Sequence, residues 1–290
     1  MASVPSPTLG GGVARSAGVG ATSRISAAFE KCKAEGRVAF IPYLTAGFPT
    51  LAQSEKLIAA IAAGGADLIE IGVPFSDPLA DGTTIQAASQ TALEQGTTLQ
   101  DCFELVRAAR EKHGIEIPLV LMGYTNPFYQ YGLERLAETA AEVGIDGFII
   151  PDLPSDESEE FAAPLRKHGR DLIFMLAPTS TNARVREAAA RASGFIYCVS
   201  VTGTTGAREK LWDGLPDYIA RVRSHTDLPL AIGFGISTPD QVRQASALAD
   251  GAVIGAALIS QVSALPEAEQ VAGITAWVRE RVDATRRSIG

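Results

Sequence analysis

The stretch that decides the fold is Leu68-Ile-Glu-Ile-Gly72, a short apolar run with one charged residue at its centre. Side chains alternate between the two faces of a strand, so Glu70 lies on the face opposite Ile69 and Ile71. The run is too short for a helix, and apart from Glu70 both of its faces are apolar. It therefore predicts a strand buried within a parallel sheet.

Similar runs recur along the chain, separated by amphipathic segments. The eight runs are Ala39–Thr45, Leu68–Gly72, Pro118–Gly123, Gly147–Pro151, Leu172–Leu176, Phe195–Ser200, Pro229–Phe234 and Gly251–Ile254. The segments between them have helix caps, of which Thr50 and Thr98 are clear examples. Eight β–α alternations in about 250 residues favour a closed (β/α)8 TIM barrel over an open doubly wound sheet. An extra helix is expected over residues 23–35, before the first strand.

Length and composition indicate a single domain over residues 24–290, preceded by a disordered extension over residues 1–23. The net charge is −8 and no basic run is present, which argues against nucleic-acid binding. No apolar run is long enough to span a membrane. Three unpaired cysteines fit a reducing, cytoplasmic location. The extension faintly resembles a transit peptide, so import into a plastid is the minor alternative.

The positions of histidine and lysine exclude several kinds of chemistry. His113, His168 and His225 all fall at the ends of predicted helices, which removes histidine-based triads and histidine-rich metal sites. We therefore expect no metal. No lysine lies at the end of a predicted strand, so imine chemistry is not expected. Carboxylates and tyrosines remain for acid–base work.

Glu70 is the leading candidate for an acid–base catalyst. Its strand places it inside the barrel mouth, where apolar surroundings raise the pKa of a carboxyl group. The alternative is a structural carboxylate bonded to backbone N–H groups. The loop that follows is unusually long and ends at Asp81, which is either a second catalytic carboxylate or a structural residue, as the N-cap of the next helix or as part of a turn before it.

Glycine-rich turns follow the last three predicted strands. Gly235 and Gly255 follow the seventh and eighth, and Thr205-Gly206 follows the sixth. Glycine lets backbone N–H groups approach an anion, and the loops after strands 7 and 8 commonly hold phosphate in this architecture. Plain tight turns are the alternative interpretation.

Four motifs together resemble the tryptophan synthase alpha subunit family. They are Pro42-Tyr-x-Thr-Ala-Gly47, Glu70-Ile-Gly-Val-Pro-Phe-Ser-Asp-Pro-Leu-Ala-Asp-Gly-x-x-Ile-Gln86, Tyr197-x-x-Ser-x-x-Gly-x-Thr-Gly206 and Gly233-Phe-Gly-Ile236. The resemblance extends from about Arg24 to the C-terminal helix. It implies a carbon–carbon lyase that cleaves indole-3-glycerol phosphate, by a retro-aldol reaction, to indole and D-glyceraldehyde 3-phosphate in L-tryptophan biosynthesis.

The resemblance also implies roles for particular residues. Glu70 would be the acid–base catalyst, Asp81 would take the positive charge at the indole N–H, and Tyr197 would assist. The indole slot would be walled by Tyr43, Met122, Tyr124, Ile149 and Phe234. Phosphate would be held by Gly206, Gly235, Gly255 and Ala256, and Thr205 would act in loop closure.

The partner implied by the resemblance is a beta subunit in an α2β2 tetramer. Pyridoxal phosphate would belong to that subunit, with no cofactor on this chain. A stand-alone lyase that releases free indole remains the alternative. The sequence departs from the family at Ala256, where a serine is usual, which removes one hydroxyl donor to phosphate. A second departure, Phe48-Pro49, puts the usual contacts of that loop in doubt.

Overall fold

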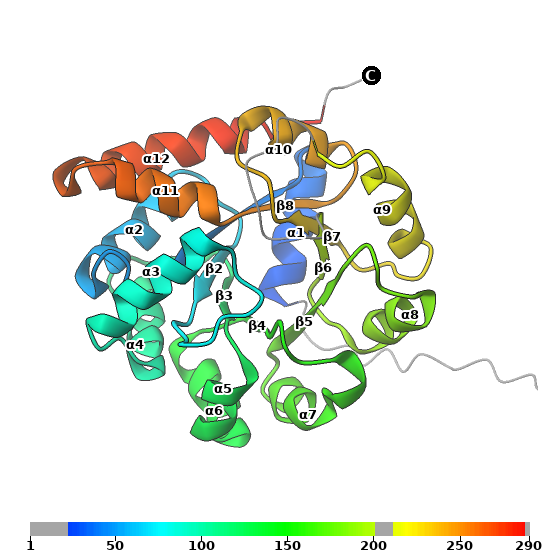
Figure 1. Cartoon of the computed structure of the whole chain (residues 1–290), viewed down its shortest axis with the longest axis horizontal. Helices are drawn as coiled ribbons and strands as arrows, with labels where there is room; N and C mark the ends of the chain where they lie inside the picture. Colours follow the sequence, from blue (N-terminus) through cyan, green and yellow to red (C-terminus); the bar gives the residue numbers. More distant parts are fainter. Residues whose placement is uncertain (1–22, 201–210, 288–290) are drawn as a thin grey trace, which may run out of the picture.

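The fold is a closed barrel of parallel strands surrounded by helices, as the sequence predicts (Figure 1). The computed structural model describes residues 23–200 and 211–287. The strands pair in chain order, and β1 also pairs with β8. They are β1 (Ala39–Thr45), β2 (Ile69–Gly72), β3 (Leu119–Met122), β4 (Gly147–Ile149), β5 (Asp171–Leu176), β6 (Ile196–Val199), β7 (Leu230–Gly233) and β8 (Gly251–Ile254). Each lies within its predicted run or within one residue of it.

Helices cover the outside of the barrel and also fill some of its loops. In the described residues they are α1 (Arg24–Ala34), α2 (Leu51–Ala63), α3 (Thr83–Glu94), α4 (Leu99–Glu111), α5 (Thr125–Tyr131), α6 (Leu133–Val143), the 3-10 turn η1 (Ser155–Glu157), α7 (Glu159–Lys167), α8 (Asn182–Arg191), α9 (Leu215–Arg223), α10 (Pro239–Ser246), α11 (Ala256–Ala264) and α12 (Glu267–Asp283). Thr50 and Thr98 cap α2 and α4 as expected. The segment between β2 and α4 is only partly a loop, because α3 occupies its second half.

Two apolar clusters form the core, one on each side of the strands. Ile69 and Ile71 belong to the outer cluster, which the helices cover, whereas Leu68 belongs to the inner cluster that fills the barrel. The alternation read from the sequence is therefore correct, and Glu70 faces the barrel interior. Burial on both sides explains why the strands are mostly apolar.

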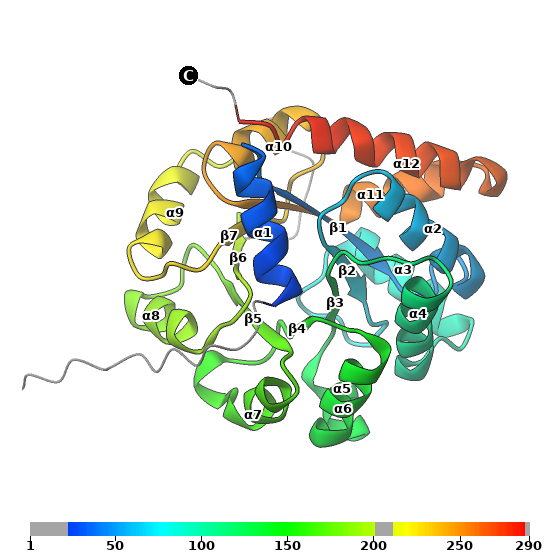
Figure 2. The same ribbon diagram turned by 180° about the vertical axis from the view of Figure 1, so that it is seen from behind.

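Helix α1 closes the end of the barrel at which the strands begin, and Figure 2 shows it lying across the centre of that end. Its buried residues Ile25, Phe29 and Cys32 join the inner cluster. The ring of Phe29 lies 5.5 Å, centroid to centroid, from that of Phe195 at the start of β6. The extra helix predicted from the sequence thus acts as a plug for the barrel.

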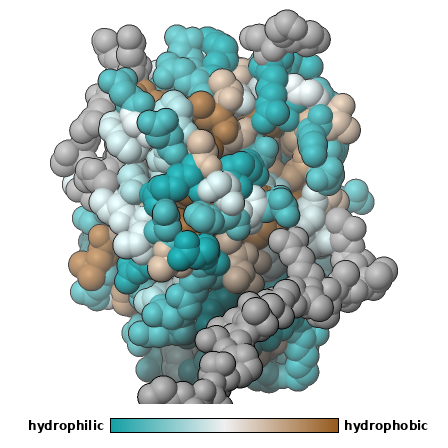
Figure 3. Space-filling view, turned by 90° about the vertical axis from the view of Figure 1, so that its right-hand side faces the viewer, coloured by the Kyte–Doolittle hydropathy of each residue, from teal (hydrophilic) through white to brown (hydrophobic). Residues whose placement is uncertain are grey.

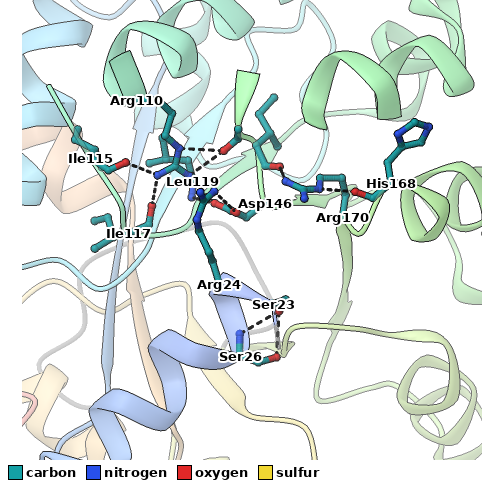
Figure 4. Close-up of polar contacts among 12 residues, drawn as sticks. Ser23, Arg24, Ser26, Arg110, Ile115, Ile117, Leu119, Asp146, His168 and Arg170 are labelled. Atoms are coloured by element: carbon teal, nitrogen blue, oxygen red, sulfur yellow. Dashed lines mark hydrogen bonds and ion pairs between the residues drawn. The ribbon is translucent and has the colours of Figure 1, made fainter. Parts of the chain in front are cut away.

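An ionic cluster at the same end fixes the plug to the loops between helices and strands (Figure 4). Asp146, just before β4, accepts hydrogen bonds from Arg24 of α1 at 3.1 Å and from Arg110 of α4 at 2.6 Å. Arg110 also donates to the backbone carbonyls of Gly144, Ile115 and Ile117. A buried aspartate is stable here because the charges are paired and their hydrogen bonds are made.

The molecular face in Figure 3 is mainly hydrophilic, with hydrophobic residues singly or in small groups. Within residues 23–200 and 211–287, no helix combines the length and apolar character needed to cross a bilayer. Cys32, Cys102 and Cys198 are buried free thiols, as predicted. The proposed extension lies outside the described residues except for Ser23, which caps α1.

Candidate active site

Glu70 is a buried carboxyl group at the mouth of the barrel. It pairs in register with Tyr43 of β1 and Val120 of β3, and only 1% of it is exposed. Within the described residues its Oε1 atom is buried and has no hydrogen-bond partner. Burial raises its pKa to about 8, so the carboxyl group holds a proton at neutral pH. The alternative of a structural carboxylate bonded to backbone N–H groups is wrong for this oxygen.

Asp81 is a second buried carboxyl group, in a more polar setting. Its Oδ2 accepts a hydrogen bond of 3.1 Å from the hydroxyl of Tyr124, which follows β3. The same hydroxyl accepts a bond from the backbone N–H of Ala80. Burial raises the Asp81 pKa to about 6, and the bond from Tyr124 limits that rise. Asp81 is not a helix N-cap, because α3 begins after Gly82 and has no side-chain cap.

Two tyrosines reach the mouth because the neighbouring strand ends in glycine. A Cβ on Gly72 would lie 2.0 Å from the hydroxyl oxygen of Tyr43, and a Cβ on Gly233 would lie 2.0 Å from that of Tyr197. The pKa of Tyr197 lies well above its usual value, first because of burial and then because of the charges of Glu70 and Asp81. Tyr197 is thus a neutral hydroxyl that feels the charge of both carboxyl groups.

The backbone after β7 and β8 offers unpaired N–H groups at the same end of the barrel. Strands β7 and β8 are neighbours, so the two turns lie side by side. Gly235 has a φ of 76°, and Gly255 directly precedes α11. In the described part of the chain, the N–H groups of Gly235, Ile236 and Ala256 make no hydrogen bond. Free N–H groups at a helix start and a tight turn are the kind of groups that bind anions in proteins.

The remaining predicted residues divide into those near this site and those that the structure does not describe. Met122 and Ile149 lie in the inner cluster with Tyr43 and Tyr197, and Phe234 packs against that cluster. Tyr124 is also buried, and its hydroxyl donates to Asp81. Thr205 and Gly206 lie outside the described residues.

Sequence reasoning missed two hydroxyl groups at the mouth. Thr45 is fully buried, and its Oγ1 lies 3.2 Å from the hydroxyl oxygen of Tyr43. Ser200, at the end of β6, donates a hydrogen bond to the carbonyl oxygen of Phe234. Both residues occur inside the motifs quoted above. Their position at the ends of predicted strands was the signal that could have identified them as residues of the mouth.

Comparison with known proteins identifies the family of this chain. The family model for the tryptophan synthase alpha chain matches residues 29–285. The chain belongs to the tryptophan synthase alpha chain family. It is 52% identical over 257 residues to the tryptophan synthase alpha chain of Roseiflexus sp. (strain RS-1), covering 89% of this chain and 98% of that protein. For the alpha chain of Chloroflexus aggregans the identity is 49%, over 91% of this chain and 99% of that one.

Solved structures of the family have the same fold. A Mycobacterium tuberculosis tryptophan synthase structure superposes with a TM-score of 0.84 at 34% identity, covering 92% of this chain and 100% of that one. The alpha subunit of Legionella pneumophila gives the same TM-score and identity, over 91% of this chain and 99% of that one. These relatives belong to the family that the motifs indicate, and they do not favour the stand-alone lyase.

Proposed function

We propose that this chain cleaves indole-3-glycerol phosphate to indole and D-glyceraldehyde 3-phosphate. Membership of the family makes it a lyase of tryptophan biosynthesis. The observation that carries the residue assignment is the contrast between its two buried carboxyl groups. Glu70 lacks hydrogen bonds at Oε1 and has a pKa near 8, whereas Asp81 is bonded to Tyr124 and has a pKa near 6. Groups with separated pKa values can divide acid and base roles.

The first step needs an acid and a counter-charge. At pH 7 Glu70 is protonated and can deliver its proton to C3 of the indole ring. The ring then carries positive charge at its N–H group. Asp81 is mainly ionised at this pH, so it accepts the N–H hydrogen bond and stabilises that charge.

The second step breaks the bond between C3 and the glycerol side chain. Glu70, now a carboxylate, removes the proton of the adjacent glycerol hydroxyl, which becomes the aldehyde oxygen. The electron pair of the broken bond returns to the ring and restores neutral indole. Glu70 ends the cycle protonated, as it began. Tyr197, which is neutral and buried in the inner cluster, assists by hydrogen bonding to the substrate. The rate of the free enzyme should therefore be greatest between pH 6 and 8.

Substrate recognition uses the two kinds of surface at the mouth. The inner-cluster side chains Met122 and Ile149 offer an apolar wall to indole. The backbone N–H groups of Gly235 and Ala256 would hold the phosphate. Ala256 would contribute only its backbone, because its side chain has no hydroxyl group. Gly255→Asp places a negative carboxylate beside that anion and should chiefly raise KM, by about tenfold or more, in steady-state kinetics. An unchanged KM in a folded variant moves the phosphate site elsewhere.

The proposed partner is a beta subunit that carries pyridoxal phosphate, with an α2β2 tetramer as the complete assembly. Family membership supports this pairing. We also propose that residues 24–290 form one domain and that this chain holds no cofactor of its own.

One experiment tests the reaction and the partner together. The purified chain is mixed with indole-3-glycerol phosphate, with and without a beta subunit, and indole and glyceraldehyde 3-phosphate are measured. We expect slow cleavage by the chain alone and faster cleavage in the complex. Glu70→Gln should lower the cleavage rate by about 10²–10⁴-fold or more. Glu116→Gln, at an exposed position, should keep the rate of the parent. Equal, rapid cleavage without the beta subunit would instead support the stand-alone lyase.

A further inference from the structure

Phe234 has an unusual backbone conformation directly after β7. Its φ is 69°, and among the non-glycine residues at 23–200 and 211–287 no other has a positive φ. An L-residue is disfavoured there because its Cβ crowds the following carbonyl oxygen. Such a conformation persists only where the surroundings hold it, and it is often found at functional sites. The contacts that hold Phe234 therefore bear on what this turn does.

Ser200 supplies the main polar contact. Its hydroxyl donates a hydrogen bond to the carbonyl oxygen of Phe234. Its backbone N–H donates to the preceding carbonyl, that of Gly233, at 2.9 Å. Ser200 is only 1% exposed, so water cannot readily replace it. The ring of Tyr197, three residues earlier, packs edge-on against the ring of Phe234. The end of β6 thus holds two successive carbonyls and the side chain of the turn.

The bond from Ser200 also determines where the next N–H group points. A trans peptide is planar, so the carbonyl oxygen of Phe234 and the N–H of Gly235 point in opposite directions. When Ser200 fixes the oxygen on its own side, the Gly235 N–H must face away from Ser200. Gly235 continues the left-handed turn with a φ of 76°, and its N–H makes no hydrogen bond to the described residues.

We propose that Ser200 is a positioning residue for anion binding, which aims the Gly235 N–H at the phosphate group of the substrate. The inference rests on the proposed function, because it places the phosphate at the turn after β7. Ser200 does not touch the substrate. Its effect is to hold the Phe234–Gly235 peptide in its binding orientation before the ligand arrives, which lowers the entropic cost of binding.

The chain offers a matched control in Ser246. It is also 1% exposed, and its hydroxyl also donates to a backbone carbonyl, that of Val242, at 2.8 Å. That bond lies within α10 and does not involve the turn. Removing either hydroxyl deletes one buried hydrogen bond, so the two variants should lose similar stability. Only the Ser200 variant should lose affinity for an anion.

The test is a titration of the full chain, labelled with ¹⁵N-glycine, with inorganic phosphate and with glycerol 3-phosphate. In the parent we expect the Gly235 amide signal to shift on binding. In Ser200→Ala the affinity for both probes should fall about 3- to 10-fold, the effect of one neutral hydrogen bond. KM for indole-3-glycerol phosphate should rise equally, with kcat within twofold of the parent. Ser246→Ala should bind as the parent does, and Ser200→Thr, which keeps the hydroxyl, should restore affinity.

Each contrary result has a distinct meaning. If the Gly235 signal of the parent responds and Ser200→Ala binds within twofold of it, Ser200 does not position the turn. The same holds if a folded Ser200→Thr loses as much affinity as Ser200→Ala. If the Gly235 signal of the parent does not respond at all, the proposed phosphate site is wrong and this inference falls with it. Should Ser200→Ala not fold, Ser200→Cys replaces it, since a thiol is a much weaker donor.

Discussion

Replacing Glu70 by glutamine should stabilise the protein while it abolishes catalysis. The carboxyl group ionises near pH 4.5 in the unfolded chain and near pH 8 in the folded one. A raised pKa means that the folded state prefers the protonated form, so its stabilising effect is present at acid pH and is lost as pH rises. Each pH unit between the two values costs the parent about 1.4 kcal/mol. Glutamine has nearly the same shape and no proton to lose, so it avoids this cost.

The quantity to measure is the difference in the free energy of unfolding between the parent and Glu70→Gln, and we expect this difference to change with pH. From pH 5 to pH 8, the free energy of unfolding of the parent should fall by about 3 kcal/mol relative to Glu70→Gln. Urea unfolding at pH 5, 6, 7 and 8 measures both proteins, and effects of other titrating groups cancel in the difference. Glu116→Gln, at an exposed position, is the control and should show no such trend. If the difference in the free energy of unfolding between the parent and Glu70→Gln stays constant within about 1 kcal/mol from pH 5 to pH 8, the pKa of Glu70 is not raised by burial. Glu70 is then not the proposed acid.

Three other substitutions test separate features of the site and the barrel. Asp81→Asn should lower kcat by about 10²–10³-fold. We expect the parent to lose activity below pH 6, the approximate pKa of Asp81, and the variant should not show this loss. A pH–rate profile like that of the parent would contradict the role of Asp81. Gly72→Ala puts a Cβ 2.0 Å from the Tyr43 hydroxyl oxygen, so kcat/KM should fall at least about tenfold in a protein that still gives the circular dichroism of the parent. Arg110→Ala breaks the pair with Asp146 and should lower the free energy of unfolding by about 3–5 kcal/mol, against less than about 1 kcal/mol for the exposed pairs of Arg107 on the same helix.

The barrel could be predicted because its signals are local. Each strand is a run of a few apolar residues, and the alternation around Glu70 alone fixes which face it occupies. Helix α3 is harder to predict from the sequence. Gly82 provides no side-chain cap, and Asp81 before it is a residue type that is common in turns. That helix depends on packing against the barrel and α11, which no local pattern records.

The partners within the site could not be predicted, because they come from distant parts of the chain. Tyr124 and Asp81 are 43 residues apart, and Ser200 and Phe234 are 34 apart. Their contacts depend on the order of strands around the barrel and on the exact ends of those strands. Sequence periodicity gives the face of a residue but not its height within the barrel. The resemblance implies that Tyr124 contacts indole, and the structure adds a hydrogen bond from its hydroxyl to Asp81 that the sequence did not reveal.

The barrel plug, helix α1, has a consequence for how the chain is made. The helix is synthesised well before the last strand, yet Phe29 packs on Phe195 and lies beside Gly251 of that strand. At about 5–20 residues per second, the more than 200 residues between Phe29 and Gly251 take roughly 10–45 s to synthesise. Throughout that time the apolar face of α1 lacks part of its native contacts. Helix α1 is thus translated early but is among the last elements to complete its native packing.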